Sequence, residues 1–155
     1  ATKAGQDDRY MFTADGRRIG STAVIPGCRE WIWWGNDVLR ATTQRDRQSG
    51  TFSVIKYQDK SVLANGLQGA VMMIADMSGD WREEIVTMLP GELRVYSTTI
   101  SARDRRVSLI QDPLYRNYIA HRSMGYDQPP MTSYYIGVDP ADAPEYTPLI
   151  QPVTK

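Results

Sequence analysis

Cysteine and histidine are almost absent from this sequence of 155 residues, which contains one of each. The single thiol, Cys28, excludes an intrachain disulfide and any zinc or iron–sulfur site built on cysteines. Because His121 is alone, metal sites that need a pair of histidines are excluded. A Ser-His-Asp or Cys-His arrangement would have to use this one ring.

A net charge is also missing, since 18 basic residues balance 18 acidic ones. This balance argues against the basic footprint of nucleic-acid-binding proteins and against a polybasic membrane-surface patch. No apolar run approaches the roughly 20 residues that a membrane-spanning helix needs. The sequence opens at Ala1 without a charged and apolar leader, so we expect a processed, recombinant or truncated product from which any export signal has been removed.

What the sequence does contain is a series of short apolar segments separated by strong turn signals, which is typical of antiparallel strands. We therefore predict an all-β fold. The first hairpin is expected over 9–19, where Asp15-Gly16 supplies the turn. Further strands are predicted over 28–34, 51–57, 70–75, 82–89, 93–98, 105–110 and 134–138.

Two segments differ from this pattern. Residues 114–122 follow Asp112-Pro113, which fits a helix with a capping aspartate and a proline in its first turn; an irregular loop is the alternative. The tail 139–155 carries four prolines, so we expect it to lie extended on the surface or along a sheet edge, outside a domain that spans 1–138.

The decapeptide from Asp76 to Ile85 places side-chain oxygens at alternate positions. They belong to Asp76, Ser78, Asp80 and Glu84, and Arg82 can add its backbone carbonyl. Alternate oxygen ligands in a tight loop suit a hard cation, so this spacing predicts a Ca²⁺ site between two strands. The alternative is an acidic turn whose carboxylates are merely solvated.

Six motifs, in order along the chain, resemble those of one enzyme family. They are WWGNDVLR at 33–40, GDWREEI at 79–85, LRVYSTT at 93–99, QDPLYR at 111–116, GYDQPP at 125–130 and YYIG at 134–137. Together they resemble the C-terminal part of the rhamnogalacturonan lyases of polysaccharide lyase family eleven, over roughly residues 5–138.

The resemblance implies an eight-bladed β-propeller with calcium ions in its loops, which cleaves the rhamnose–galacturonate backbone of pectin by β-elimination. At about 40–45 residues a blade, this chain would supply three to four blades. An open ring lacks the closure that stabilises a propeller, so we expect a second polypeptide chain or segment to supply the remaining blades. That partner implies a nicked enzyme or a split subunit; the alternative is a truncated product that folds alone as a small sandwich.

The resemblance also points to two substrate loops. Asn65, Gly66 and Gln68 stand where the resemblance implies asparagine-glycine-threonine-lysine in the family. Gln68 takes the place of the lysine, carries no charge and cannot act as a base. Ser123 stands where the family has an asparagine, whereas Tyr126 matches the family's tyrosine near the sugar.

β-Elimination beside a uronate needs a neutralised carboxylate, for which Ca²⁺ with Arg or Lys would serve, and a base that removes H5. His121 and Arg122, next to the second loop, are candidates to replace the lost lysine as base and carboxylate partner, so Tyr126, His121 and Arg122 form the candidate catalytic set. We expect a secreted or periplasmic, calcium-dependent lyase component that acts on an acidic plant polysaccharide. The alternative is a carbohydrate-binding or structural propeller piece that has lost the base.

Overall fold

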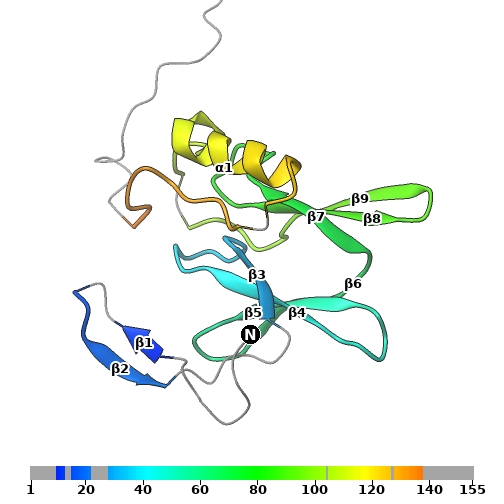
Figure 1. Ribbon diagram of the computed structural model, residues 1–155, viewed down its shortest axis with the longest axis horizontal. Helices are drawn as coiled ribbons and strands as arrows, with labels where there is room; N and C mark the ends of the chain where they lie inside the picture. The colour runs from blue at the N-terminus through cyan, green and yellow to red at the C-terminus, as the bar shows by residue number, and fades with distance from the viewer. Residues whose placement is uncertain (1–9, 13–14, 22–27, 104, 127, 138–155) are drawn as a thin grey trace, which may run out of the picture.

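A computed structural model describes residues 10–12, 15–21, 28–103, 105–126 and 128–137. Within these ranges the chain forms short antiparallel strands and one α-helix (Figure 1). The all-β prediction therefore holds for most of the described structure, with a single helix added.

The strands form three sheets in which sequence neighbours pair antiparallel. The first sheet pairs β1 (Tyr10–Phe12) with β2 (Arg18–Ser21). The second contains β3 (Cys28–Ile32), β4 (Ala41–Arg45), β5 (Phe52–Lys56) and β6 (Val62–Leu67) in that order. The third contains β7 (Ala70–Ala75), β8 (Glu84–Leu89) and β9 (Glu92–Tyr96).

Turn chemistry explains why these strands reverse where they do. Gly16, in the predicted hairpin turn between β1 and β2, has a φ of 84°, which an L side chain rarely adopts. Between β5 and β6, the carboxylate of Asp59 accepts hydrogen bonds from the backbone N–H and the hydroxyl of Ser61, at 2.9 and 2.6 Å. Such local side-chain bonds hold a turn without help from the ladder.

Two apolar clusters fill the interior. The first joins the second and third sheets; its buried members are Ile32, Trp34, Ala41, Phe52, Val54, Leu67, Ile74 and Ile85. The second is formed by residues outside the strands, from the loops, η1 (Leu109–Gln111) and α1 (Pro113–Ser123); its buried members are Trp33, Trp81, Leu109, Tyr115 and Ile136. Adjacent Trp33 and Trp34 therefore belong to different clusters and tie them together.

The helix α1 (Pro113–Ser123) lies beside β7 and corresponds to the segment for which a helix or a loop was expected. Its start follows the sequence signals: the Asp112 side chain accepts a hydrogen bond from the Leu114 N–H at 2.9 Å, and Pro113 occupies the first turn. The helix, rather than the loop, is what the chain forms there.

Two predicted strands are wrong. The segment 105–110 forms no strand and instead leads into a short 3₁₀ turn, η1 (Leu109–Gln111), because the Ser108 hydroxyl and the Leu109 N–H both donate to the Asp76 carboxylate. Residues 134–137 are also irregular, since Ile136 gives its carbonyl to the Arg106 side chain rather than to a ladder. Residue 138 and the tail 139–155 lie outside the described residues.

Two strands that we did not predict are β4 and β6. β4 reads Ala-Thr-Thr-Gln-Arg and lacks the bulky apolar residues of a typical buried strand, and β6 contains the dipeptide Asn65-Gly66, which usually signals a turn. Among the described residues the three sheets close no ring, and no helix there is long and apolar enough to cross a membrane.

Candidate functional site

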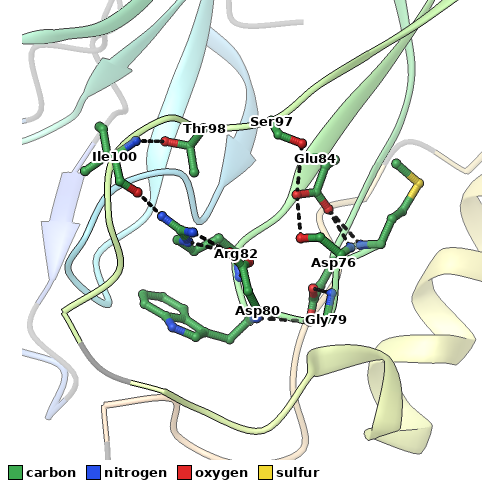
Figure 2. A network of polar contacts seen from close by, with 11 residues as sticks. Asp76, Gly79, Asp80, Arg82, Glu84, Ser97, Thr98 and Ile100 are labelled. Atoms are coloured by element: carbon green, nitrogen blue, oxygen red, sulfur yellow. Dashed lines mark hydrogen bonds and ion pairs between the residues drawn. The ribbon is translucent and has the colours of Figure 1, made fainter.

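The loop that joins β7 to β8 is organised around the buried carboxylate of Asp76 (Figure 2). One oxygen accepts from the Gly79 N–H at 2.8 Å. The other accepts from the N–H groups of Trp81 and Leu109, at 3.2 and 2.7 Å, and from the Ser108 hydroxyl at 2.9 Å. Asp76 therefore closes its own loop and ties it to the turn that precedes α1.

The other two carboxylates predicted to bind a cation are occupied in the same way. Glu84 accepts from the N–H groups of Met77 and Ser78, at 2.8 and 3.1 Å, and from the Ser78 hydroxyl at 2.9 Å. Asp80 forms an ion pair with Arg82, whose guanidinium also donates to the Ile100 carbonyl. Each carboxylate thus faces protein donors.

This arrangement does not fit the calcium cage predicted from the spacing. Ca²⁺ requires about six to eight oxygens that all face one point, and N–H donors aimed at a carboxylate oxygen compete with the ion for its lone pairs. Within the described ranges, no group of three acidic, histidine or cysteine side chains is arranged to hold a metal. Calcium binding therefore stays a prediction of the sequence.

Glu83 is a buried acid that no predicted role had included. Its side chain is fully buried, and its carboxylate accepts from the Trp33 N–H at 2.9 Å and from the Tyr115 hydroxyl at 2.8 Å. Burial raises the pKa of Glu83 to about 7, although the positive charge of Arg40 opposes this shift. Glu83 joins the residue that follows β3 to α1 and lies inside the protein, so its role is structural.

A concave pocket of about 600 Å³ lies between the second sheet, β7 and the turn after α1. Its polar lining comes from Glu30, Thr43, Arg45, Arg122 and Tyr126, and Phe52 and Met72 add apolar surface. Arg122 and Glu30 form an ion pair at 3.0 Å with both side chains nearly buried. Tyr126, by contrast, is 63% exposed.

The candidate catalytic residues fall in or near this pocket. Arg122 and Tyr126 line it. His121 is exposed at the end of α1, and its ring centroid lies 6.1 Å from that of Tyr126. Ser123 is also exposed and donates its hydroxyl to the Ala120 carbonyl at 2.6 Å. The segment 123–126, which is predicted to contact substrate, therefore lies at the edge of the pocket.

The first substrate loop is not part of the pocket lining. Asn65 and Gly66 lie exposed in β6. The side-chain oxygen of Gln68 accepts from Arg94 at 2.7 Å, and its backbone N–H donates to the Tyr96 hydroxyl at 3.1 Å. The position that lacks the family's lysine is therefore engaged with a neighbouring arginine.

Arg45 and Glu30 also line the pocket, although neither was among the residues predicted to form the site. No strand was predicted over 41–45. Without a strand there, the sequence places Arg45 in a solvated turn and not on the face of a sheet. Arg45 in fact ends β4, and Glu30 lies on the adjacent strand β3. No local signal identifies them, because they meet Arg122 only through tertiary packing.

Comparisons with known proteins agree on one family. The model of the rhamnogalacturonan lyase family 11 C-terminal domain matches residues 2–146. The chain is 36% identical over 149 residues to the rhamnogalacturonan endolyase YesW of Bacillus subtilis, covering 89% of this chain and 24% of YesW. It is 34% identical over 145 residues to the rhamnogalacturonan exolyase YesX of the same species, covering 82% of this chain and 23% of YesX.

Solved structures give the same result. The crystal structure of YesW matches with a TM-score of 0.62 and 33% identity, over 90% of this chain and 25% of that one. A Bacillus licheniformis rhamnogalacturonan lyase matches with a TM-score of 0.60 and 33% identity, over 83% of this chain and 23% of that one. The chain spans about a quarter of the length of these relatives. It belongs to the rhamnogalacturonan lyases of family 11, in which it corresponds to the C-terminal domain.

Proposed function

We propose that this chain is the C-terminal part of a lyase that cleaves the rhamnogalacturonan backbone of pectin, or a related acidic glycan, by β-elimination. The family match over residues 2–146 carries this proposal, because both named relatives from Bacillus subtilis are rhamnogalacturonan lyases. The pocket beside Tyr126 supports it with a concave surface of a size suited to sugar rings.

The chemistry of β-elimination sets what the pocket has to supply. The negative charge of the uronate carboxylate must be balanced, so that H5 becomes acidic. A base then removes H5, and the bond from C4 to the glycosidic oxygen breaks as the double bond forms between C4 and C5. The departing oxygen takes a proton from an acid or from water and leaves as the hydroxyl of the released sugar. No covalent intermediate is needed.

We assign the proton-transfer role to His121 and the sugar contact to Tyr126. Both side chains are exposed, their rings lie 6.1 Å apart between centroids at an interplanar angle of 53°, and a neutral imidazole nitrogen can accept a proton. Arg122 suits a different role, since its guanidinium is buried and paired with Glu30. Its carbonyl accepts a hydrogen bond from the Gly125 N–H, next to Tyr126, and its side chain lines the pocket.

The same proposal includes a partner sheet. Met88, Leu93 and Val95 lie on one face of the third sheet and are 49%, 70% and 58% exposed, whereas Ile85 and Thr87 on the opposite face are buried. A further sheet of the lyase, packed on the exposed apolar face as in a propeller, would cover these side chains. The relatives contain about three quarters of their length beyond the matched part, which leaves room for such blades.

A polysaccharide is too large to cross a membrane intact, so a lyase that acts on it must meet it outside the cytoplasm. We therefore propose a secreted or periplasmic location. The predicted calcium dependence gains no support from the 76–84 loop, where the carboxylates face protein donors.

The test is the ultraviolet absorbance of unsaturated uronate products, recorded while the native protein is incubated with rhamnogalacturonan I, with and without EDTA. The proposal predicts a steady rise, and a loss of about 100-fold or more in the His121→Gln variant. Tyr135→Phe is the control, because Tyr135 is 74% exposed and does not line the pocket. An unchanged rate in His121→Gln would contradict the assigned base.

A second function is favoured by one residue. Gln68 stands where the resemblance implies a lysine, and its amide cannot act as a base; it is hydrogen-bonded to Arg94. A carbohydrate-binding part without catalytic activity explains a glutamine at this position as well as a lyase does. In that case rhamnogalacturonan would bind but no absorbance would develop with or without EDTA.

A further inference from the structure

Arg45 is held rigidly at the edge of the pocket. Its Nη1 donates to the Gly50 carbonyl at 3.2 Å and its Nη2 to the Gly69 carbonyl at 2.9 Å. Its guanidinium carbon lies 5.9 Å from the centroid of the Phe52 ring. The side chain is thus fixed from two sides while it still lines the pocket.

The backbone that holds Arg45 is itself fixed. Gly69 has a φ of 97°, and a Cβ at this position would lie 2.9 Å from the Met88 carbonyl oxygen and from the Thr87 Cβ. Only glycine fits so close to β8, so the Gly69 carbonyl has a defined place. A guanidinium anchored to it is preorganised and loses little freedom when it binds a ligand.

The pocket carries an unbalanced positive charge. Glu30 neutralises Arg122 across 3.0 Å, whereas Arg45 forms no ion pair with any residue that the structure describes. A guanidinium has five N–H donors, and the two carbonyls use two of them. Three donors and a full charge are therefore available to an anionic ligand in this pocket.

We propose that Arg45 binds the carboxylate of a uronate sugar and thereby selects acidic over neutral glycans at this pocket. This proposal rests on the proposed function, and in it Arg45 is the group that recognises the negative charge of the substrate. Arginine suits this task because its planar, permanently charged fork matches a carboxylate. Tyr126 and Phe52 would supply the neighbouring surfaces for the sugar ring.

Isothermal titration calorimetry of the native protein tests this role with two probes. One is a rhamnogalacturonan oligosaccharide, and the other is the same oligosaccharide after its carboxylates have been reduced to alcohols. We expect Arg45→Gln to weaken binding of the acidic probe about tenfold or more, with less than about a twofold effect on the reduced probe. Arg45→Lys, which keeps the charge but not the fork, is expected to lie between these values.

Arg47→Gln is the matched control, because Arg47 is exposed in the turn that follows β4 and does not line the pocket. Circular dichroism verifies that each variant is folded. If Arg45→Gln weakens both probes equally, or neither, Arg45 does not read the carboxylate and the inference is overturned. If the wild-type protein binds neither probe, the proposed function fails and the inference fails with it.

Discussion

At the scale of single residues, the role of each acidic side chain depends on which hydrogen-bond donors surround its carboxylate. Burial raises the pKa of Asp76 although its hydrogen bonds oppose the shift, since removing a carboxylate from water favours its neutral form. Asp76 nonetheless accepts four hydrogen bonds, which hold its loop together and join it to Ser108 and Leu109. The oxygen spacing of the decapeptide gave no sign of this structural role, because the sequence shows the oxygen but not the donors folded around it.

Asp76→Ala is expected to lower the free energy of unfolding by about 3 kcal/mol or more, because it leaves several buried donors unpaired. Asp80→Ala is the comparison, since Asp80 is more exposed and its ion pair with Arg82 contributes at most about 1 kcal/mol. Urea unfolding, followed by tryptophan fluorescence, measures both values. Equal losses in the two variants would contradict the central position assigned to Asp76.

Glu83 is expected to make stability fall as the pH rises. Its pKa of about 7 in the folded protein lies above the ordinary value of 4.5, so the folded state holds the proton more tightly than the unfolded state does. The stabilisation from the neutral acid is complete below about pH 4.5 and is lost as the pH increases to about 7 and beyond. Arg40 opposes this loss by attracting the ionised form.

The measurement is a set of urea unfolding curves between about pH 5 and 8, for the wild type and for Glu83→Gln. The variant keeps the shape of the side chain but cannot ionise, so its stability should depend less steeply on pH in this window. Glu30→Gln serves as a control for the loss of a different carboxylate. Identical slopes in the wild type and in Glu83→Gln would contradict the raised pKa.

At the scale of elements, strands were predicted well where apolar residues cluster between clear turns and poorly where they do not. The strands around 52–56, 70–75 and 84–89 follow such patterns. β4 is hidden because its buried positions include Thr42 and Thr43, and Thr42 donates its hydroxyl to the Glu30 carbonyl instead of packing an apolar chain. Long-range contacts of this kind decide the element but leave no local trace.

The 76–84 loop illustrates the same limit for function. Its spacing of oxygens was visible in the sequence, but the direction of each oxygen was not. Trp81 in this loop has a φ of 69°, unusual for a residue with a side chain, and its ring is buried in the second cluster. Packing of the indole therefore contributes to the loop's conformation along with the Asp76 carboxylate.

The contacts of this loop predict that calcium does not stabilise it, whereas the spacing of its oxygens predicts that calcium does. Thermal unfolding in EDTA and in calcium chloride decides between them, together with equilibrium dialysis against Ca²⁺. From the hydrogen bonds of Asp76 and Glu84, we expect the same melting temperature in both buffers. Stoichiometric binding that Asp80→Ala abolishes would instead support the sequence prediction.

At the scale of the whole molecule, the described sheets leave an apolar face uncovered while the other face packs in the core. The hairpin of β8 and β9 projects from the body of the chain (Figure 1), and its exposed side carries Met88, Leu93 and Val95. The sequence implied missing blades by resemblance and by length alone. The exposed fractions of these side chains are the reason for proposing that a neighbouring sheet packs on this face.

Val95→Glu is expected to disrupt association with the remainder of the lyase, because it places a charge in the proposed sheet contact. Val62→Glu is a matched control, since Val62 is 56% exposed and Val95 is 58% exposed, but Val62 lies on the second sheet. Size-exclusion chromatography with light scattering measures the assembly. An unchanged assembly in Val95→Glu would contradict the proposed contact.

We propose cleavage of an acidic glycan by β-elimination as the activity of the lyase to which this chain belongs, and the end group of the product tests this proposal most directly. Mass spectrometry of oligosaccharides released from rhamnogalacturonan I should find an unsaturated uronate at each new non-reducing end. A saturated sugar at that end, heavier by one water molecule, would show hydrolysis instead and contradict the account.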